Sequence, residues 1–265
     1  MKESTFFLTI GDLVIRIDIS KITEKTIRDV LSKQITSYYT SELTHDCESP
    51  DFTITYIAEE EYRFVKETKG NNGIHYFLET FILKECEALV HYHTSIAQFQ
   101  FFLKMILQSL LGEQQGFILH SSAICDEKNV HLFLGPNGIG KSTIVENLSS
   151  VFTPFADDMV IIRKSNSGWN AYQLPLEKKR YNNLALKGEN VRSLCYLKQS
   201  ENTTLTKLSP IKASNRLLEQ LIKNGATEQN VKAVLLFLAD VDHFILETPQ
   251  QTDIPTMQKL VRRYR

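Results

Sequence analysis

The sequence has few cysteines and no excess of charge of either sign. Its four cysteines, Cys47, Cys86, Cys125 and Cys195, are widely separated and form no C-x-x-C pair, which argues against a disulfide framework and against a zinc site. Lys and Arg number 30 against 31 Asp and Glu, so no overall basic field favours nucleic acid or an anionic membrane as a partner. We therefore expect reduced thiols and neither of those two partners.

Long apolar runs are also missing. The most apolar helical stretch, residues 96–111, is interrupted by Gln98, Gln100, Lys104 and Gln108 and is too polar for a membrane span. The N-terminus reads MKESTFF and lacks the apolar core of a signal peptide. We expect a soluble cytoplasmic protein. Its 265 residues, 42% of them hydrophobic, can bury one large core or two smaller ones, and we favour two.

Residues 135–142 read GPNGIGKS and fit the pattern G-x-x-x-x-G-K-[ST]. An apolar run, Val130 to Leu134, precedes them, and a helix-like stretch begins at Ser142. In this context glycines let backbone N–H groups face phosphate oxygens, Lys141 reaches the outer phosphates, and Ser142 offers its hydroxyl to Mg²⁺. We therefore predict a site for ATP and Mg²⁺. Its residues are Gly135, Pro136, Asn137, Gly138, Ile139, Gly140, Lys141, Ser142 and Thr143.

An acidic pair, Asp157 and Asp158, follows this segment after one short helix and one predicted strand. A nucleotide–Mg²⁺ site needs hard oxygen ligands, and a phosphotransferase also needs a carboxylate that orients or deprotonates the acceptor hydroxyl. Two adjacent carboxylates can divide these tasks. An Asp-Asp dipeptide is usually a solvated turn, but its position after the loop helix favours a functional role here.

His120 is a further candidate, at the end of the apolar run that begins at Phe117. A histidine in that place is usually structural, yet histidine titrates near neutral pH and could assist transfer to an acceptor. The other histidines, including His91 and His93, have no metal-ligand spacing. Basic clusters at residues 178–180 and 262–265 could meet phosphate or an acidic substrate, although such runs are commonly solvated faces.

Periodicity and turn signals divide the chain into an N-terminal α+β lobe, residues 1–113, and a core with a C-terminal extension of helices and strands, residues 114–265. In the first lobe we expect a hairpin of residues 5–10 and 13–19, a helix with Ile27, Val30 and Leu31 on one face, strands at 52–57, 62–66, 74–83 and 88–92, and a buried helix over 94–111. In the second we expect an extended run at 117–124, a hairpin into 130–134, strands at 151–156, 193–197 and 243–246, a hairpin of 159–163 with 169–174, and helices beginning after Ser209, near Thr227 and after Asp253.

The segments LHSSAI, LGPNGIGKST and FADDMVIIRK, followed by a turn with Trp169 and by Gln173-Leu174-Pro175-Leu176, resemble the HPr kinase/phosphorylase-related kinases. The resemblance covers residues 116–176 well and the rest of the chain loosely. It implies an α/β fold whose nucleotide core is similar to that of phosphoenolpyruvate carboxykinase, preceded here by a mixed, β-rich N-terminal lobe. It also implies an active-site role for His120, with proton acceptance from a serine hydroxyl and Mg²⁺ contact shared by Asp157 and Asp158. By the same analogy we place the metal at Ser142 and Asp158.

One departure bears on the substrate. The loop E-x-R-G-L-G-I that HPr kinase/phosphorylases carry after the acidic pair has no counterpart in this sequence, so HPr is not the expected acceptor. Related stand-alone kinases modify other hydroxyls, including serines of small ribosomal peptides such as lasso peptides. The resemblance therefore implies a kinase whose partner is a peptide or protein with an acceptor serine. The sequence does not decide whether the protein forms a homo-oligomer.

Two alternatives to a peptide or protein kinase remain at this point. One is a nucleotide-binding regulatory module without phosphotransfer, and the other is a kinase of a small-molecule hydroxyl. An ABC-type ATPase is disfavoured, because the sequence after Lys141 contains neither an LSGGQ-like signature nor a distal apolar strand ending in Asp-Glu. Phosphoenolpyruvate carboxykinase activity is disfavoured because the arginine set that would bind a carboxylate is not found.

Overall fold

The computed structural model describes residues 4–44, 47–58, 66–69, 75–79, 81–83, 85–126, 129–176, 188–223, 226–249 and 255. The chain divides into two compact units, Met1–Leu103 and Lys104–Arg265, and each is a mixed α/β structure built on a mixed sheet. No helix among these residues is both long and apolar enough to cross a membrane. The basic clusters at 178–180 and 262–265, the predicted strand at 62–65 and, apart from residue 255, the predicted C-terminal helix lie outside the described residues.

The first unit contains a six-stranded sheet with the order β3-β1-β2-β4-β8-β7. β1 (Thr5–Ile10) and β2 (Leu13–Asp18) form the predicted hairpin. Its turn residues Gly11 and Asp12 have positive φ angles of 60° and 64°, as a two-residue hairpin turn of type I′ requires. The other strands are β3 (Leu43–Thr44), β4 (Phe52–Ile57), β7 (Phe81–Leu83) and β8 (Glu87–His91), while β5 (Lys66–Lys69) and β6 (His75–Glu79) pair separately.

Helix α1 (Lys25–Tyr38) corrects one detail of the prediction. Its buried residues are Leu31 and Ile35, one helical turn apart, while Val30 is 52% exposed. Adjacent helical positions point about 100° apart, so the face that buries Leu31 turns Val30 toward solvent. Helix α2 (Ile96–Glu113) forms as predicted. In the first unit its Phe99 ring contacts the rings of Tyr39 and Tyr56.

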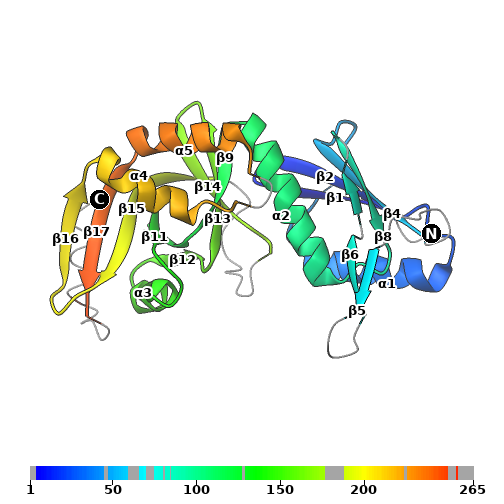
Figure 1. Ribbon diagram of the computed structural model, residues 1–265, viewed down its shortest axis with the longest axis horizontal. Coiled ribbons are helices and arrows are strands. Elements are labelled where there is room, and N and C mark those ends of the chain that lie inside the picture. Colours follow the sequence, from blue (N-terminus) through cyan, green and yellow to red (C-terminus); the bar gives the residue numbers. More distant parts are fainter. Residues whose placement is uncertain are drawn as a thin grey trace. The chain divides into compact units, whose positions relative to one another are not determined.

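The second unit is built on a nine-stranded sheet whose centre is a parallel pair, β11 (Asn129–Leu134) and β15 (Glu189–Gln199). On the β11 side lie β10 and then β12, and on the other side β17 runs parallel to β15 and pairs with β16 (Figure 1). β14, β13 and β9 continue from the first residues of β15. The bounds are β9 Gly116–His120, β10 Ser122–Cys125, β12 Thr153–Ala156, β13 Met159–Ser165, β14 Gly168–Gln173, β16 Thr204–Leu208 and β17 Asp242–Thr248.

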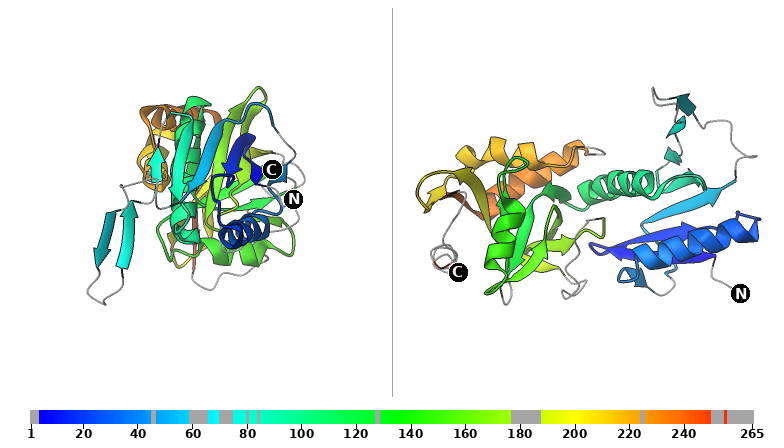
Figure 2. Two further views of the ribbon diagram at one scale, coloured as in Figure 1. Left: turned by 90° about the vertical axis from the view of Figure 1, so that its right-hand side faces the viewer. Right: turned by 90° about the horizontal axis from the view of Figure 1, so that it is seen from below.

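Helices cover both faces of this sheet (Figure 2). On one face α3 (Lys141–Leu148) packs Ile144 and Leu148 against Phe133 and Phe244 of the strands. On the other face lie α4 (Pro210–Gln220) and α5 (Glu228–Asp240). There the Phe237 ring of α5 lies 5.4 Å from the ring of Phe117 and 5.1 Å from that of Trp169, distances typical of edge-to-face aromatic contacts in a core.

Most of the predicted elements of this unit are confirmed, with four differences. The predicted run at 117–124 is two strands, β9 and β10. β15 is longer than the predicted strand at 193–197, and β16 was not predicted. Residues of β16 such as Thr204 and Lys207 are exposed, which leaves a weak strand pattern. Ser209 precedes α4 but its side chain makes no capping hydrogen bond, whereas Thr227 and Asn230 at α5 form a reciprocal capping box.

Candidate active site

The glycine loop, residues 135–140, joins the end of β11 to the first turn of α3. Gly138 and Gly140 have φ angles of +78° and +106°. A Cβ atom at either position would meet nothing within 4 Å. Glycine is therefore needed here for its access to left-handed backbone conformations and not for lack of space. Pro136, Asn137 and Gly138 are exposed at the tip of the loop.

Lys141, the first residue of α3, is turned back onto the glycine loop. Its Nζ donates hydrogen bonds to the carbonyl oxygens of Gly135 at 2.9 Å and Pro136 at 3.4 Å, and the residue is 7% exposed. Burial lowers the pKa of the Lys141 ammonium, and the charge of Asp158 acts in the opposite direction. The Lys141 ammonium thus lies inside the loop and interacts electrostatically with Asp158 of the acidic pair. Ser142 and Thr143 of the first helical turn are exposed.

Strand pairing brings the acidic pair to the glycine loop. β12 ends at Ala156 and pairs with β10, which in turn pairs with β11. The hydroxyl of Ser122 in β10 donates a hydrogen bond to the carbonyl oxygen of Asp157. Ser122 lies opposite Phe133, two residues before the loop begins. The Asp157-Asp158 turn is therefore held one strand away from the start of the loop.

His120 and Asp158 form a pair in the same region. His120 Nε2 lies 3.0 Å from Asp158 Oδ1, and their side chains are 24% and 58% exposed. The hydrogen bond from His120 lowers the pKa of Asp158, with added contributions from the charges of His120, Lys141 and Lys104, although partial burial opposes the shift. The carboxylate of Asp158 is consequently ionised at neutral pH and remains open to solvent on its other side.

Two buried amide side chains hold β9 in place behind His120. The amide oxygen of Gln108 in α2 accepts from the Ile118 backbone N–H at 2.7 Å, and its Nε2 donates to the Ile222 carbonyl at 3.0 Å. Asn230 Nδ2 donates to the carbonyls of Gly116 and Gln108 at 2.9 and 2.8 Å. Buried amides satisfied in this way fix a strand rigidly. They thus set the position of His120 at its end.

The structure places His120 next to Asp158 and puts the charges of Lys141 and Lys104 within reach of that carboxylate. From the sequence, Lys104, Gln108 and Ser122 had not been assigned to this region. The α2 helix carries a signal that could have revealed the first two. Gln100, Lys104 and Gln108 recur every fourth residue within a mainly apolar helix, and such spacing places them on one face. A polar stripe on a helix that also carries many core residues indicates a contact with polar atoms.

The residues near the loop suit a nucleotide-bound Mg²⁺ and no preformed metal centre. Among the described residues no three His, Cys, Asp or Glu side chains are grouped so that they could hold a metal ion. Magnesium usually takes one or two protein oxygens and completes its shell with substrate phosphates and water. The exposed Ser142 hydroxyl and the ionised Asp158 carboxylate are hard oxygen donors of that kind and fit the ion.

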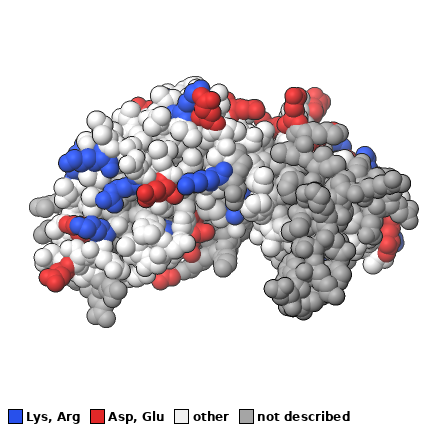
Figure 3. Space-filling model, in the orientation of Figure 1, with Lys and Arg blue, Asp and Glu red and all other residues white. Residues whose placement is uncertain are grey.

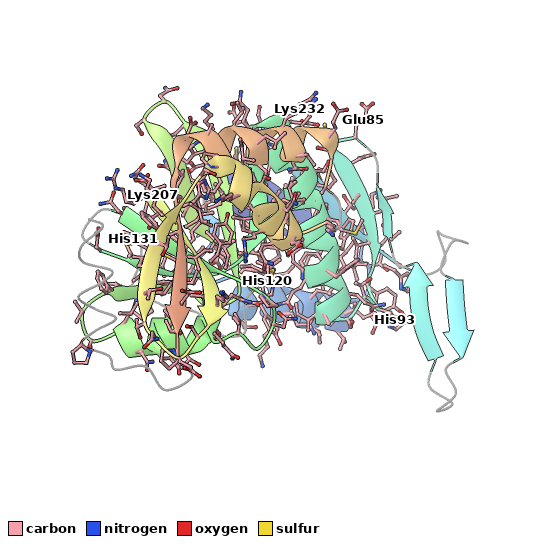
Figure 4. All side chains as sticks on the ribbon, turned by 60° about the vertical axis from the view of Figure 1, so that its left-hand side comes forward. Glu85, His93, His120, His131, Lys207 and Lys232 are labelled. Atoms are coloured by element: carbon pink, nitrogen blue, oxygen red, sulfur yellow. The ribbon has the colours of Figure 1, made fainter. Side chains whose placement is uncertain are left out.

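A second polar set, Asp126, His131 and Ser193, lies elsewhere in this unit. His131 Nδ1 lies 2.8 Å from Ser193 Oγ, and His131 Nε2 lies 3.4 Å from Asp126 Oδ2. These residue types recur in nucleophilic catalysis, but Ser193 and His131 are each only 2% exposed, so no substrate reaches the hydroxyl. Figure 4 shows His131 well apart from His120. The set therefore serves as a buried polar link between β11 and β15.

A groove of about 760 Å³ lies between α4 and α5, and its lining includes none of His120, Lys141 and Asp158. Its lining includes Leu218, Leu221 and Val231 together with the charged residues Glu219, Glu228 and Lys223. Over α4, Lys and Arg side chains are interspersed with Asp or Glu side chains (Figure 3). An apolar groove with acidic side chains and mixed surface charge is poorly suited to bind a phosphate group.

No protein-family model and no curated protein matches the sequence. Among solved structures, the chain is similar to the HPr(Ser) kinase/phosphatase from Coxiella burnetii. The TM-score is 0.34 and the sequence identity 13%, over 55% of this chain and 94% of that chain. This is a distant structural similarity, and it assigns the chain to no family.

Proposed function

We propose that the chain is an ATP-dependent phosphotransferase that moves the γ-phosphoryl group to a hydroxyl, with a serine of a peptide or protein as the acceptor. One observation carries the proposal. An ionised carboxylate, Asp158, is hydrogen-bonded to His120 and interacts electrostatically with Lys141 of the glycine loop. A phosphate-binding lysine and a proton-accepting pair in one place are what transfer to a hydroxyl requires.

The nucleotide would bind at the glycine loop. Backbone N–H groups of the loop and the N-terminus of α3 would face the phosphates. The Lys141 ammonium, now bonded to loop carbonyls, would turn to the β- and γ-phosphate oxygens. Mg²⁺, held by the Ser142 hydroxyl and a carboxylate oxygen of Asp158, would neutralise part of the charge on the phosphates.

In the transfer step, the acceptor oxygen forms a bond to the γ-phosphorus. The bond from that phosphorus to the β,γ-bridging oxygen breaks, and its electron pair leaves on ADP. The hydroxyl proton passes to the acidic pair, where the hydrogen bond between Asp158 and His120 holds one carboxylate ionised and oriented. A carboxylate with a lowered pKa is a weak base, so its main contribution is to orient the hydroxyl and to accept the proton late in the step.

A polypeptide acceptor is favoured over a metabolite by the amount of chain outside the nucleotide site. The first unit, Met1–Leu103, contains none of the residues assigned to the chemistry. A small hydroxyl compound requires no additional surface of that size, whereas recognition of a peptide does. The basic residues 178–180, which follow the core in sequence, are the ones we expect to meet an acidic peptide or its carboxylate end.

The test is transfer of labelled phosphate. The protein is incubated with Mg²⁺ and γ-labelled ATP in the presence of cell lysate, candidate peptides, free serine or sugars, and the label is located. Label on a polypeptide serine supports the full proposal. Label only on a small molecule supports the kinase and overturns the polypeptide acceptor. Binding of ATP without any transfer would favour the alternative, a nucleotide-gated regulatory module.

A further inference from the structure

Lys104 of α2 is a cation without an obvious structural task. It is partly buried, and among the described residues its ammonium makes no hydrogen bond and no ion pair. Burying part of a charged side chain costs free energy unless something compensates. Lysines without such a partner normally extend fully into water. Among the described residues, the compensation visible for Lys104 is its longer-range attraction to the carboxylate of Asp158.

The pairing of α2 with β9 places Lys104 beside His120. α2 ends at Glu113, and the chain reverses into β9, so the two elements run in opposite directions (Figure 1). Their register is fixed by the 2.7 Å hydrogen bond from the Ile118 N–H to the Gln108 side chain. From Gln108, Lys104 lies one turn back along the helix, about 6 Å. From Ile118, His120 lies two residues forward along the strand, about 7 Å in the same direction.

We propose that Lys104 forms an anion subsite beside the His120–Asp158 pair and binds the γ-phosphoryl group of the nucleotide. This inference rests on the proposed function and adds a residue to it. Lys141 approaches the phosphates from the glycine loop, whereas Lys104 approaches from α2, on the side of the His120–Asp158 pair. The γ-phosphoryl group would then lie between two ammonium groups from different elements.

The balance of charge around Asp158 supports this subsite. Its carboxylate is faced by His120 from β9, Lys141 from α3 and Lys104 from α2, and the charge of Lys104 contributes to the lowered pKa of Asp158. Asp157 adds one further carboxylate. A γ-phosphoryl group spreads its negative charge over three oxygens, and cations on both sides of it stabilise the group as it is transferred. Lys104 forms and breaks no covalent bond in the step.

The test compares nucleotides with and without a γ-phosphoryl group. Dissociation constants for Mg-ADP and for the non-hydrolysable analogue Mg-AMP-PNP are measured by calorimetry for the full chain and for Lys104→Met, which keeps the length of the side chain and removes its charge. We expect Lys104→Met to weaken Mg-AMP-PNP binding at least about fivefold, the scale of one exposed charge-assisted contact. Mg-ADP binding should stay within about twofold.

Three further variants sharpen the comparison. Lys104→Arg keeps the charge and should restore most of the Mg-AMP-PNP affinity, and Lys104→Gln replaces Lys104→Met if that variant does not fold. Lys212→Met removes the charge of a lysine in α4 that is more exposed than Lys104. It should change the affinity for neither Mg-AMP-PNP nor Mg-ADP. Equal losses for both nucleotides, no loss for either, or the same loss in Lys104→Arg would overturn the subsite. If the unaltered chain binds neither nucleotide, the proposed function itself is wrong and the subsite with it.

Discussion

His120 Nε2 lies 3.0 Å from Asp158 Oδ1 and thereby ties the end of β9 to the turn between β12 and β13. Met159, the residue after the turn, lies opposite His120 in the β9–β13 ladder. Backbone pairing and a side-chain hydrogen bond therefore act on the same few residues. The pair is preorganised, because little has to move for the carboxylate to face a ligand at the glycine loop.

Removing the imidazole should change the acid stability of the protein. The hydrogen bond from His120 is the main cause of the lowered pKa of Asp158. A carboxyl group with a lowered pKa in the folded state stabilises that state above its unfolded pKa, about 3.9, and loses this contribution as pH falls through the folded value. The free-energy difference between the unaltered chain and His120→Ala, from urea unfolding, should therefore be larger at pH 6 than at pH 3. A difference that does not vary with pH would mean that His120 acts by packing alone.

Each aspartate of the acidic pair should matter for transfer. Asp157→Asn and Asp158→Asn remove a negative charge while keeping size and shape, and we expect each to lower the transfer rate at least about a hundredfold, the scale of general acid–base assistance. Asp242→Asn is a matched control, because Asp242 makes an exposed ion pair with Lys207, and its rate should be unchanged. Full activity in a folded variant with both substitutions would show that Asp157 and Asp158 form a solvated turn without a role in transfer.

Local signals explain why so much of this arrangement could be predicted. The motif with Lys141 lies between an apolar run and a helical pattern, and the acidic pair follows the next strand, so chain order favours a position near the loop. The pairing of β12 with β10 and of β10 with β11 then brings the two together. The role of His120 rested chiefly on the resemblance, because residues 117–124 contain no turn signal that would separate one strand from the next. In the structure that run is two strands, β9 and β10, which pair with different neighbours.

The glycine loop offers a test of backbone conformation separate from sterics. At Gly138 φ is +78° and an added Cβ would meet no atom within 4 Å. If the loop kept this conformation, Gly138→Ala would destabilise the folded state by about 1–2 kcal/mol, the usual penalty for a side chain in the left-handed region. Because the loop can relieve that strain by changing shape, we expect weaker Mg-ATP binding with an almost unchanged melting temperature. Unchanged affinity would show that the loop conformation does not depend on this glycine.

The support behind His120 can be tested by stability. Asn230→Ala removes two hydrogen bonds to the carbonyls of Gly116 and Gln108 and one half of the capping box at α5. Leaving those buried carbonyls without a donor should lower the free energy of unfolding by about 2–4 kcal/mol. Asn215→Ala, at an exposed site on α4, should stay within about 0.5 kcal/mol. Urea unfolding measures both, and equal values would contradict the role of Asn230.

Long-range contacts explain what the sequence did not reveal. Asn230 belongs to α5, more than a hundred residues along the chain from Gly116, yet bonds to it, and Gln108 bonds to Ile222. No local pattern predicts such pairs, because each depends on the packing of α2, β9 and α5 together. Likewise the position of Lys104 beside His120 depends on the register of α2 against β9. In the sequence these residues can be recognised only as polar interruptions in apolar segments. Their partners can be identified only in the folded structure.

The most direct test of a single phosphotransfer site is hydrolysis of Mg-ATP without any added acceptor, where water takes the place of the hydroxyl. Release of inorganic phosphate is measured for the unaltered chain, for Lys141→Met and for Asp158→Asn. We predict slow release by the unaltered chain, none above background for Lys141→Met, and a loss of at least about a hundredfold for Asp158→Asn. A chain that binds Mg-ATP yet releases phosphate no faster than Lys141→Met would contradict the account.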